Sequence, residues 1–221
     1  TVLIATHVSP DGDAIGSSAA LALGLRKLGK EARVFSASDV DQRFEGIISA
    51  GMVEVVDDSS ALALQGKFDV CVLLDTSEPS RAGVLEPVIF AEAQKRVCVD
   101  HHLLHGEYSF DSHLVLAKSP ATACLVLGLL DELEVALDED IARALWLGLS
   151  TDTGWFRFAN GIAECETVTT LEGRVSQRVP YSGACPGFGG HAIQNDGWVC
   201  ASVDLSKPGE TQSLVHLVSS T

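Results

Sequence analysis

A histidine and two aspartates follow the first apolar run of the chain within seven positions. The stretch "HVSPDGD" places His7, Asp11 and Asp13 after the run "VLIA". Carboxylates this close repel one another unless something positive lies between them, and the candidates are a metal ion, a basic side chain, or only water at a helix start. Imidazole and carboxylate ligands without a thiolate suit Mn²⁺, Fe²⁺, Co²⁺ or Zn²⁺. Two aspartates separated by one glycine could each hold a different ion of a pair.

The same stretch also has a purely structural explanation. Asp13 can cap a helix that begins near Gly16, Asp11 and Gly12 can form a turn, and His7 can be a polar residue at a strand end. The stretch alone does not decide between the two explanations.

Three later segments carry the same residue types at the ends of apolar or helical runs. Asp75 closes "DVCVLLD", and a carboxylate after so apolar a run is expected to be partly buried and to need a cation. Asp100, His101 and His102 close "KRVCVDHH", where one histidine can bind a metal, the other can face a substrate, and the acid can orient an imidazole. Asp152 closes a helical stretch in "LSTDTGWFRF". Each segment alone is also typical of a turn, a loop start or a helix end.

Strands that alternate with helices must position these residues. The expected strands cover 1–6, 31–37, 68–76 and 95–102, and the expected helices cover 16–30, 119–133 and 138–153. Ser119 before Pro120 predicts an N-cap for the second helix. The continuous apolar run at 68–76 indicates a strand buried on both faces, as in a parallel sheet. The pattern predicts an α/β fold with a doubly wound, mainly parallel sheet, whose ligands gather beyond the carboxyl ends of the strands.

The character of the chain changes near residue 160. Residues 161–221 are rich in Gly, Ser and Thr and show no clear alternation of strand and helix, so we expect a small irregular C-terminal region there. Within it, "GFGGHA" offers Gly189 and Gly190, which permit close backbone approach to a phosphate, and His191, which could add a charge-assisted contact. The alternative for this segment is an ordinary glycine-rich loop.

Composition limits the classes of partner. The net charge of −15 over 221 residues argues against wrapping long nucleic acid, although bound divalent metals would still allow a short phosphorylated substrate. No apolar run approaches the length of a membrane span and no signal peptide is recognisable, so we expect no membrane partner.

The six cysteines form no CxxC pair and favour a reducing compartment, most simply the cytoplasm. Since Thr1 already lies in a strand-like run, we expect a few residues before it.

Taken together, the segments "HVSPDGDAIGS", "LLDTSEPSR", "VDHH" and "STDTGWFRF" resemble the DHH phosphoesterase superfamily over roughly residues 1–160. Within the superfamily, these motifs are most similar to those of the nanoRNase/pAp phosphatase branch. Enzymes of this branch remove mononucleotides from very short oligoribonucleotides and dephosphorylate 3′-phosphoadenosine 5′-phosphate (pAp). The superfamily also contains cyclic-dinucleotide phosphodiesterases, RecJ single-strand exonucleases and family II inorganic pyrophosphatases.

The resemblance implies a site for two divalent metal ions, most simply Mn²⁺. It implies that one ion is held by His7 and Asp11, that the second is held by Asp13, His101 and Asp152, and that Asp75 bridges the two. It further implies that His102 contacts the scissile phosphate and protonates the leaving oxygen, with Asp100 supporting the histidines. Two such ions would deliver hydroxide to phosphorus without a covalent intermediate.

In the family a Gly-Gly-His loop on a second domain binds the nucleotide end of the substrate, and Gly189, Gly190 and His191 resemble it. Only 36 residues separate Asp152 from Gly189, fewer than in the family, so a shortened or aberrant C-terminal (DHHA1-like) region is expected over 161–221.

The sequence therefore predicts a manganese-dependent phosphoesterase acting on short nucleotides. Within the enzymes, the alternatives are a dinucleotide phosphodiesterase acting on cyclic or linear substrates, a pyrophosphatase, and a RecJ-like exonuclease. The exonuclease is disfavoured because the chain is acidic with few aromatic residues. From another class, the alternative is a catalytically impaired module that binds nucleotide or metal. The sequence leaves the oligomeric state open, a homodimer included.

Overall fold

A computed structural model describes residues 1–44, 46–91, 95–103, 110–117 and 119–154, together with the backbone of five short strands between residues 163 and 219. Six parallel strands form the central sheet in the order β3-β2-β1-β4-β5-β6. They are β1 (Val2–Ala5), β2 (Ala32–Ser36), β3 (Val53–Val55), β4 (Val70–Leu74), β5 (Lys95–Asp100) and β6 (Ser112–Val115).

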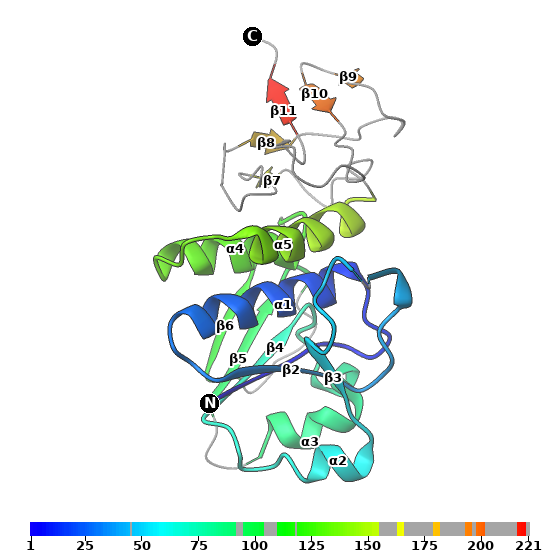
Figure 1. The fold of residues 1–221 in the computed structure, drawn as a ribbon, viewed down its shortest axis with the longest axis vertical. Helices are drawn as coiled ribbons and strands as arrows, with labels where there is room; N and C mark the ends of the chain where they lie inside the picture. Colours follow the sequence, from blue (N-terminus) through cyan, green and yellow to red (C-terminus); the bar gives the residue numbers. More distant parts are fainter. Residues whose placement is uncertain are drawn as a thin grey trace.

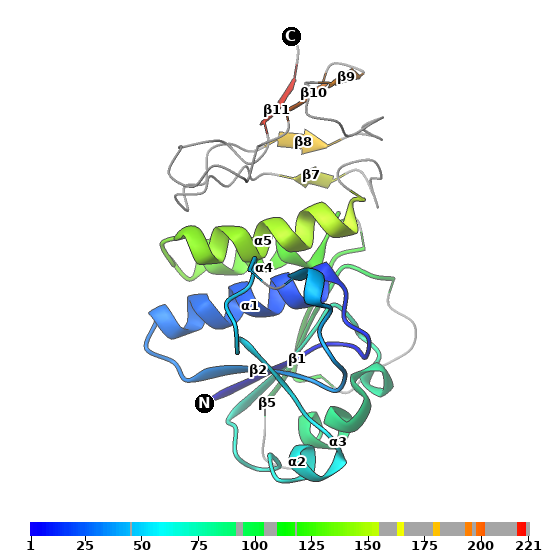
Figure 2. The ribbon, with the colours of Figure 1, turned by 45° about the vertical axis from the view of Figure 1, so that its right-hand side comes forward.

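Helices cover both faces of this sheet, as Figures 1 and 2 show. One face carries α1 (Gly12–Lys27), α4 (Thr122–Glu132) and α5 (Glu139–Asp152), and α5 packs on α1 and α4. The other face carries α2 (Asp58–Leu62), α3 (Glu86–Ile89) and the 3₁₀ turn η2 (Pro79–Leu85). A second 3₁₀ turn, η1 (Gln42–Phe44), lies between β2 and β3 in the chain. The expected α/β fold with a doubly wound parallel sheet is confirmed.

The core has two halves because the sheet is buried on both faces. In β4, Val72 and Leu74 belong to the cluster on the α1 side, whereas Cys71 and Leu73 belong to the cluster on the α2 and α3 side. Successive side chains of a strand point to opposite faces. A central strand covered on both faces therefore has to be apolar at every position, which explains its uninterrupted run of apolar residues.

Beyond Gly154 the structure describes only short antiparallel strands. They are β7 (Ala163–Cys165) paired with β8 (Val179–Tyr181), and β9 (Ile193–Asn195), β10 (Trp198–Ala201) and β11 (His216–Ser219) in a separate three-stranded sheet. The predicted boundary near residue 160 and the predicted phosphate contacts Gly189, Gly190 and His191 lie outside the described residues.

Two predicted helix starts are wrong. Helix α1 begins at Gly12 rather than near Gly16, because the Asp11 side chain accepts hydrogen bonds from the backbone N–H groups of Asp13 and Ala14 and caps the helix. Helix α4 begins at Thr122 after Ala121, so Ser119 is not its N-cap. A carboxylate from α1 performs that function instead.

Candidate metal centre

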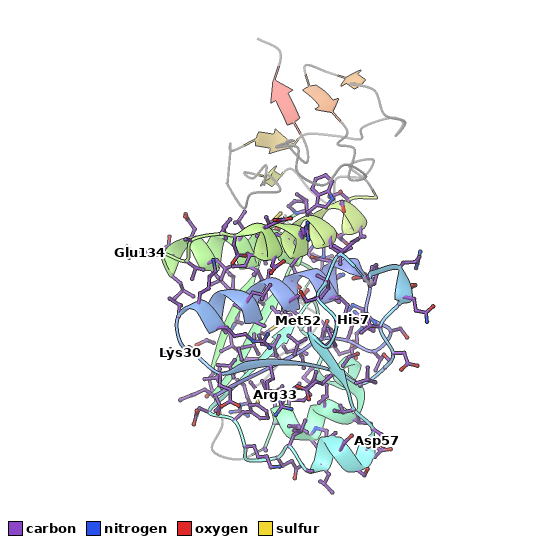
Figure 3. The ribbon with its side chains drawn as sticks, viewed as in Figure 1. His7, Lys30, Arg33, Met52, Asp57 and Glu134 are labelled. Atoms are coloured by element: carbon purple, nitrogen blue, oxygen red, sulfur yellow. The ribbon has the colours of Figure 1, made fainter. Side chains whose placement is uncertain are left out.

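The sequence-predicted ligands meet at the carboxyl edge of the sheet, where the central strands β1, β4 and β5 end side by side. His7 lies two residues beyond β1, Asp75 directly follows β4, and His101 directly follows β5. Asp13 lies in the first turn of α1 and Asp152 is the last residue of α5. Figure 3 labels His7 close to the beginning of α1.

The ligand atoms form three overlapping groups, within each of which all atoms lie within 4.8 Å of one another. The groups are His7, Asp11 and Asp75; Asp13, His101 and Asp152; and Asp75, His101 and His102. The first group joins Asp75 to the two residues expected for one ion, and the second consists of the three residues expected for the other ion. Asp75 belongs to the first and third groups and not to the second, and His101 connects the second and third groups.

The two carboxylate oxygens of Asp75 face opposite sides. Oδ2 lies 3.5 Å from Nε2 of His7, and Oδ1 lies 3.6 Å from Nε2 of His101. The side chain is 1% exposed, and its Oδ1 accepts a hydrogen bond of 2.9 Å from the hydroxyl of Thr122. The backbone of Asp75 has φ 62°, in the left-handed region, which costs a residue with a Cβ on the order of 1–2 kcal/mol. This local strain is located at the residue whose two carboxylate oxygens face His7 and His101.

Asp13 is fully buried and is a capping residue for another helix. Its Oδ2 accepts a hydrogen bond of 2.6 Å from the N–H of Thr122, and its Oδ1 accepts one of 2.9 Å from the N–H of Ala123. These are orphan donors at the start of α4, which a carboxylate satisfies well. Burial, together with the charges of Asp75 and Asp152, nevertheless raises the pKa of Asp13 well above its usual value. Among the described residues, neither Asp13 nor Asp75 pairs with a lysine or arginine.

His101 provides the test of whether these residues fit a metal. Its Nδ1 lies 3.1 Å from the carbonyl oxygen of Ser119, which can only accept, so Nδ1 carries the proton and Nε2 presents a lone pair. Within the described part of the chain, this buried Nε2 has no hydrogen-bond partner. It faces carboxylate oxygens of Asp13, Asp75 and Asp152 at 3.8, 3.6 and 3.6 Å.

These separations leave space for a cation, because ligand atoms lie about 2.0–2.2 Å from a bound divalent metal such as zinc. A buried lone pair surrounded by carboxylates needs a positive group between them. The donor set of imidazole and carboxylate therefore fits a divalent metal ion.

His7 is oriented in the same manner on the other side of Asp75. Its Nδ1 lies 2.9 Å from the carbonyl oxygen of Val8, which leaves Nε2 to face Asp75. Burial lowers the pKa of His7, but the hydrogen bonds to Asp75 and Val8 and the charges of Asp75 and Asp11 outweigh it, so that the pKa is raised overall. Asp11 is exposed, and its Oδ1 atom caps α1.

His102 differs from the other two histidines in being accessible. Its side chain is 48% exposed, and its Nδ1 and backbone N–H both contact Oδ1 of Asp100, at 2.8 and 3.0 Å. The hydrogen bond to Asp100 raises the pKa of His102 against the effect of burial, and the charges of Asp75, Asp100 and Asp152 add to it. Burial alone would raise the pKa of Asp100, but the contacts from His102 hold it below its usual value. A group on the open side of the centre can meet a bound molecule.

Sequence reasoning misses the residues that hold these ligands. Ser119, Thr122 and Ala123 contact His101, Asp75 and Asp13, but their partners lie far away in the chain. The only local signal is a hydroxyl residue at a helix start, which is equally typical of an ordinary cap.

The described residues contain no helix both long enough and apolar enough to cross a membrane.

Comparisons with known proteins identify the family of the chain. The model of the DHH family, N-terminal domain, matches residues 1–149. The chain is 36% identical over 163 residues to the bifunctional oligoribonuclease and PAP phosphatase NrnA of Thermus thermophilus, an alignment that covers 74% of this chain and 46% of that protein.

Two solved structures share the fold. One is an exopolyphosphatase-related protein from Bacteroides fragilis, with a TM-score of 0.66 and 24% identity, covering 72% of this chain and 48% of that one. The other is a putative family II inorganic pyrophosphatase from Methanococcus jannaschii, with a TM-score of 0.53 and 21% identity, covering 73% and 51%. The chain spans about half the length of these relatives. The family match covers most of the chain and all but one of the residues gathered at the centre, and on that ground the chain belongs to the DHH family.

Proposed function

We propose that this chain is the metal-binding part of a manganese-dependent phosphoesterase that hydrolyses phosphate esters of short nucleotides. The observation that carries the proposal is the buried Nε2 of His101, which has no hydrogen-bond partner in the described part of the chain and faces three carboxylates. The name of the Thermus relative supports the substrate class, which is a very short oligoribonucleotide or pAp.

The ligands divide between two ions in this proposal. His7 and Asp11 would hold one ion, Asp13, His101 and Asp152 would hold the other, and Asp75 would serve both. When bound, the two ions lower the pKa of a water molecule and offset negative charge on the phosphoryl oxygens.

The protein's own groups supply the rest of the chemistry. His102, on the open side of the centre, contacts the scissile phosphate and gives a proton to the leaving oxygen. Asp100 fixes the His102 ring through the 2.8 Å contact with Nδ1, so that Nε2 points to the substrate. Gly189, Gly190 and His191 are proposed to bind the nucleotide end of the substrate.

The chain's acidity supports a short substrate over a long strand. A net charge of −15 repels a phosphate backbone except where metal ions reverse the local field. The buried thiols of Cys71 and Cys98 support a reducing compartment such as the cytoplasm.

The test is hydrolysis by the full 221-residue chain. Protein freed of metal, then supplied with Mn²⁺, is incubated with pAp and with a diribonucleotide, and released phosphate or mononucleotide is measured. Turnover that requires Mn²⁺ and is lost in Asp75→Asn is expected. Folded, metal-loaded protein that turns over neither substrate would contradict the proposal, and nucleotide binding without hydrolysis, unchanged by Asp75→Asn, would favour the non-catalytic module.

A further inference from the structure

One five-residue segment contacts ligands from three different elements. The segment 119–123, "SPATA", connects the region after β6 to the first turn of α4. It touches His101, which follows β5, Asp75, which follows β4, and Asp13, which belongs to α1. A single short stretch of chain therefore connects three ligands that are far apart in the sequence.

Each contact fixes a different property of its ligand. The carbonyl oxygen of Ser119 selects the tautomer of His101 that leaves Nε2 free. The N–H groups of Thr122 and Ala123 each donate to one oxygen of Asp13, which fixes the plane of that carboxylate. The hydroxyl of Thr122 donates to Oδ1 of Asp75, which fixes the rotation that sends Oδ2 towards His7.

The side chain of Thr122 donates a hydrogen bond to one of these ligands, Asp75. It is fully buried, and its N–H and its hydroxyl contact the two carboxylates that belong to different ligand groups. A side chain of the same shape without the hydroxyl would leave the backbone contact to Asp13 in place and remove only the contact to Asp75.

We infer that the segment 119–123 aligns the metal ligands and that Thr122 is a positioning residue for Asp75, the carboxylate shared by the two sites. The inference rests on the proposed metal centre and adds a residue that acts through the ligands. Partners of this kind that orient a metal ligand typically contribute about 10–100-fold to metal affinity or activity.

The experiment compares Thr122→Val, which keeps the shape and the N–H but loses the hydroxyl, with Thr122→Ser, which keeps the hydroxyl. Mn²⁺ binding to metal-free protein is measured by isothermal titration calorimetry, and folding is checked by circular dichroism. Thr122→Val is expected to bind Mn²⁺ about 10–100-fold more weakly, whereas Thr122→Ser stays close to the wild type. Thr122→Ala is the second hydroxyl-free variant, in case the valine methyl group crowds Asp75.

The outcomes separate this inference from the proposed function. Wild-type protein that binds no divalent metal would overturn the metal centre itself. Wild-type protein that binds Mn²⁺, with Thr122→Val and Thr122→Ala binding it equally well, would overturn only the positioning role. Equal weakening in the serine variant would also overturn it, because the hydroxyl would then not be the group that matters.

Discussion

Asp75 has one carboxylate oxygen directed to each side of the centre, and this arrangement has a local cost. The residue adopts a left-handed backbone conformation, is buried, and lies close to the buried carboxylate of Asp13. Burial and the neighbouring charges of Asp75 and Asp152 raise the pKa of Asp13. A buried carboxylate in this strained position is better explained by a bound ligand than by a contribution to stability.

Replacing Asp75 with asparagine is expected to remove metal binding. Asparagine keeps the shape and tolerates the left-handed backbone, but it lacks the negative charge that the two sites share. We expect the affinity for Mn²⁺ to fall by at least about 100-fold, above the effect typical of an orienting residue, when metal content is measured after dialysis. Asp57→Asn is the matched control, because Asp57 caps α2 on the other face of the sheet. An Asp75→Asn protein that retains two ions would contradict the bridging role.

Replacing His102 with alanine is expected to separate chemistry from metal binding. The side chain is half exposed and contacts Asp100, so its loss leaves the two main ligand groups intact. We expect Mn²⁺ content to stay at the wild-type value while kcat falls by about 10²–10⁴-fold, the usual contribution of a general acid. Loss of the metal together with the activity would show that His102 is a ligand instead.

The ligand types can be predicted from the sequence, but the residues that orient them cannot. His7, Asp75 and His101 follow strands, and parallel strands end at one edge, so their meeting follows from the fold. The cap of α4 comes instead from Asp13, 109 residues before Thr122. No local pattern can reveal a hydrogen bond over that separation, and for that reason the sequence around α4 points to Ser119 as the cap.

At the scale of elements, the approach of α5 to α1 brings Asp152 to the centre. A Cβ on Gly16 would lie 2.4 Å from the carbonyl oxygen of Ala144 and 2.7 Å from the backbone nitrogen of Gly148. A Cβ on Gly148 would lie 2.6 Å from Oδ1 of Asp13. The two helices therefore meet backbone to backbone, close to Asp13, the proposed ligand that α1 carries.

Gly16→Ala is expected to destabilise the protein. The new methyl group would meet backbone atoms that cannot rotate away, and overpacking of this kind costs about 1–3 kcal/mol. Urea unfolding followed by circular dichroism measures the change. Gly128→Ala is the matched control, because Gly128 is an exposed residue of α4 and an added methyl group there would have nothing within 4 Å, so this variant should gain about 0.5–1 kcal/mol. Equal effects of the two substitutions would contradict the close approach of the helices.

The long elements are predictable from the sequence and the short ones are not. Strands β1, β2, β4 and β5 have apolar runs that stand out, and the three long helices show clear periodicity. Strand β3 has three residues, all partly or fully exposed, and strand β6 begins with two exposed residues at the edge of the sheet. Their pairing depends on the neighbouring strand, which their own sequence does not specify.

At the scale of the whole molecule, the doubly covered sheet shields two thiols. Burial raises the pKa of Cys71 to about 12, and burial with the charge of Asp100 does the same for Cys98. Thiolates are the reactive form, so both cysteines should resist iodoacetamide at a pH of about 8 in the native protein and react after unfolding in urea, as peptide mass mapping would show. The pKa of each thiol is about 9.0 in the unfolded protein and about 12 in the folded protein. Ionisation of the unfolded thiols therefore lowers the free energy of unfolding as the pH rises above about 9.0. Labelling at the same rate in both states would contradict the burial of these thiols.

Metal is expected to stabilise the whole fold. A ligand that binds only the native state at about 100 times its dissociation constant adds about 2.7 kcal/mol. The melting temperature of metal-free protein should therefore rise on addition of Mn²⁺ and fall again with a chelator, as differential scanning calorimetry would show. Asp75→Asn should show no such response. A wild-type melting temperature independent of Mn²⁺ would contradict the centre.

The strand order has a consequence for how the protein reaches its final state. Strand β1 pairs with β4, with Val2 opposite Val70, and Asp152 comes at the end of α5. Asp13 is thus synthesised early, but its hydrogen-bond donor Thr122 follows 109 residues later. Contacts between such distant segments slow folding. Metal binding during refolding should therefore be a late event. Its appearance would report that the complete fold has formed.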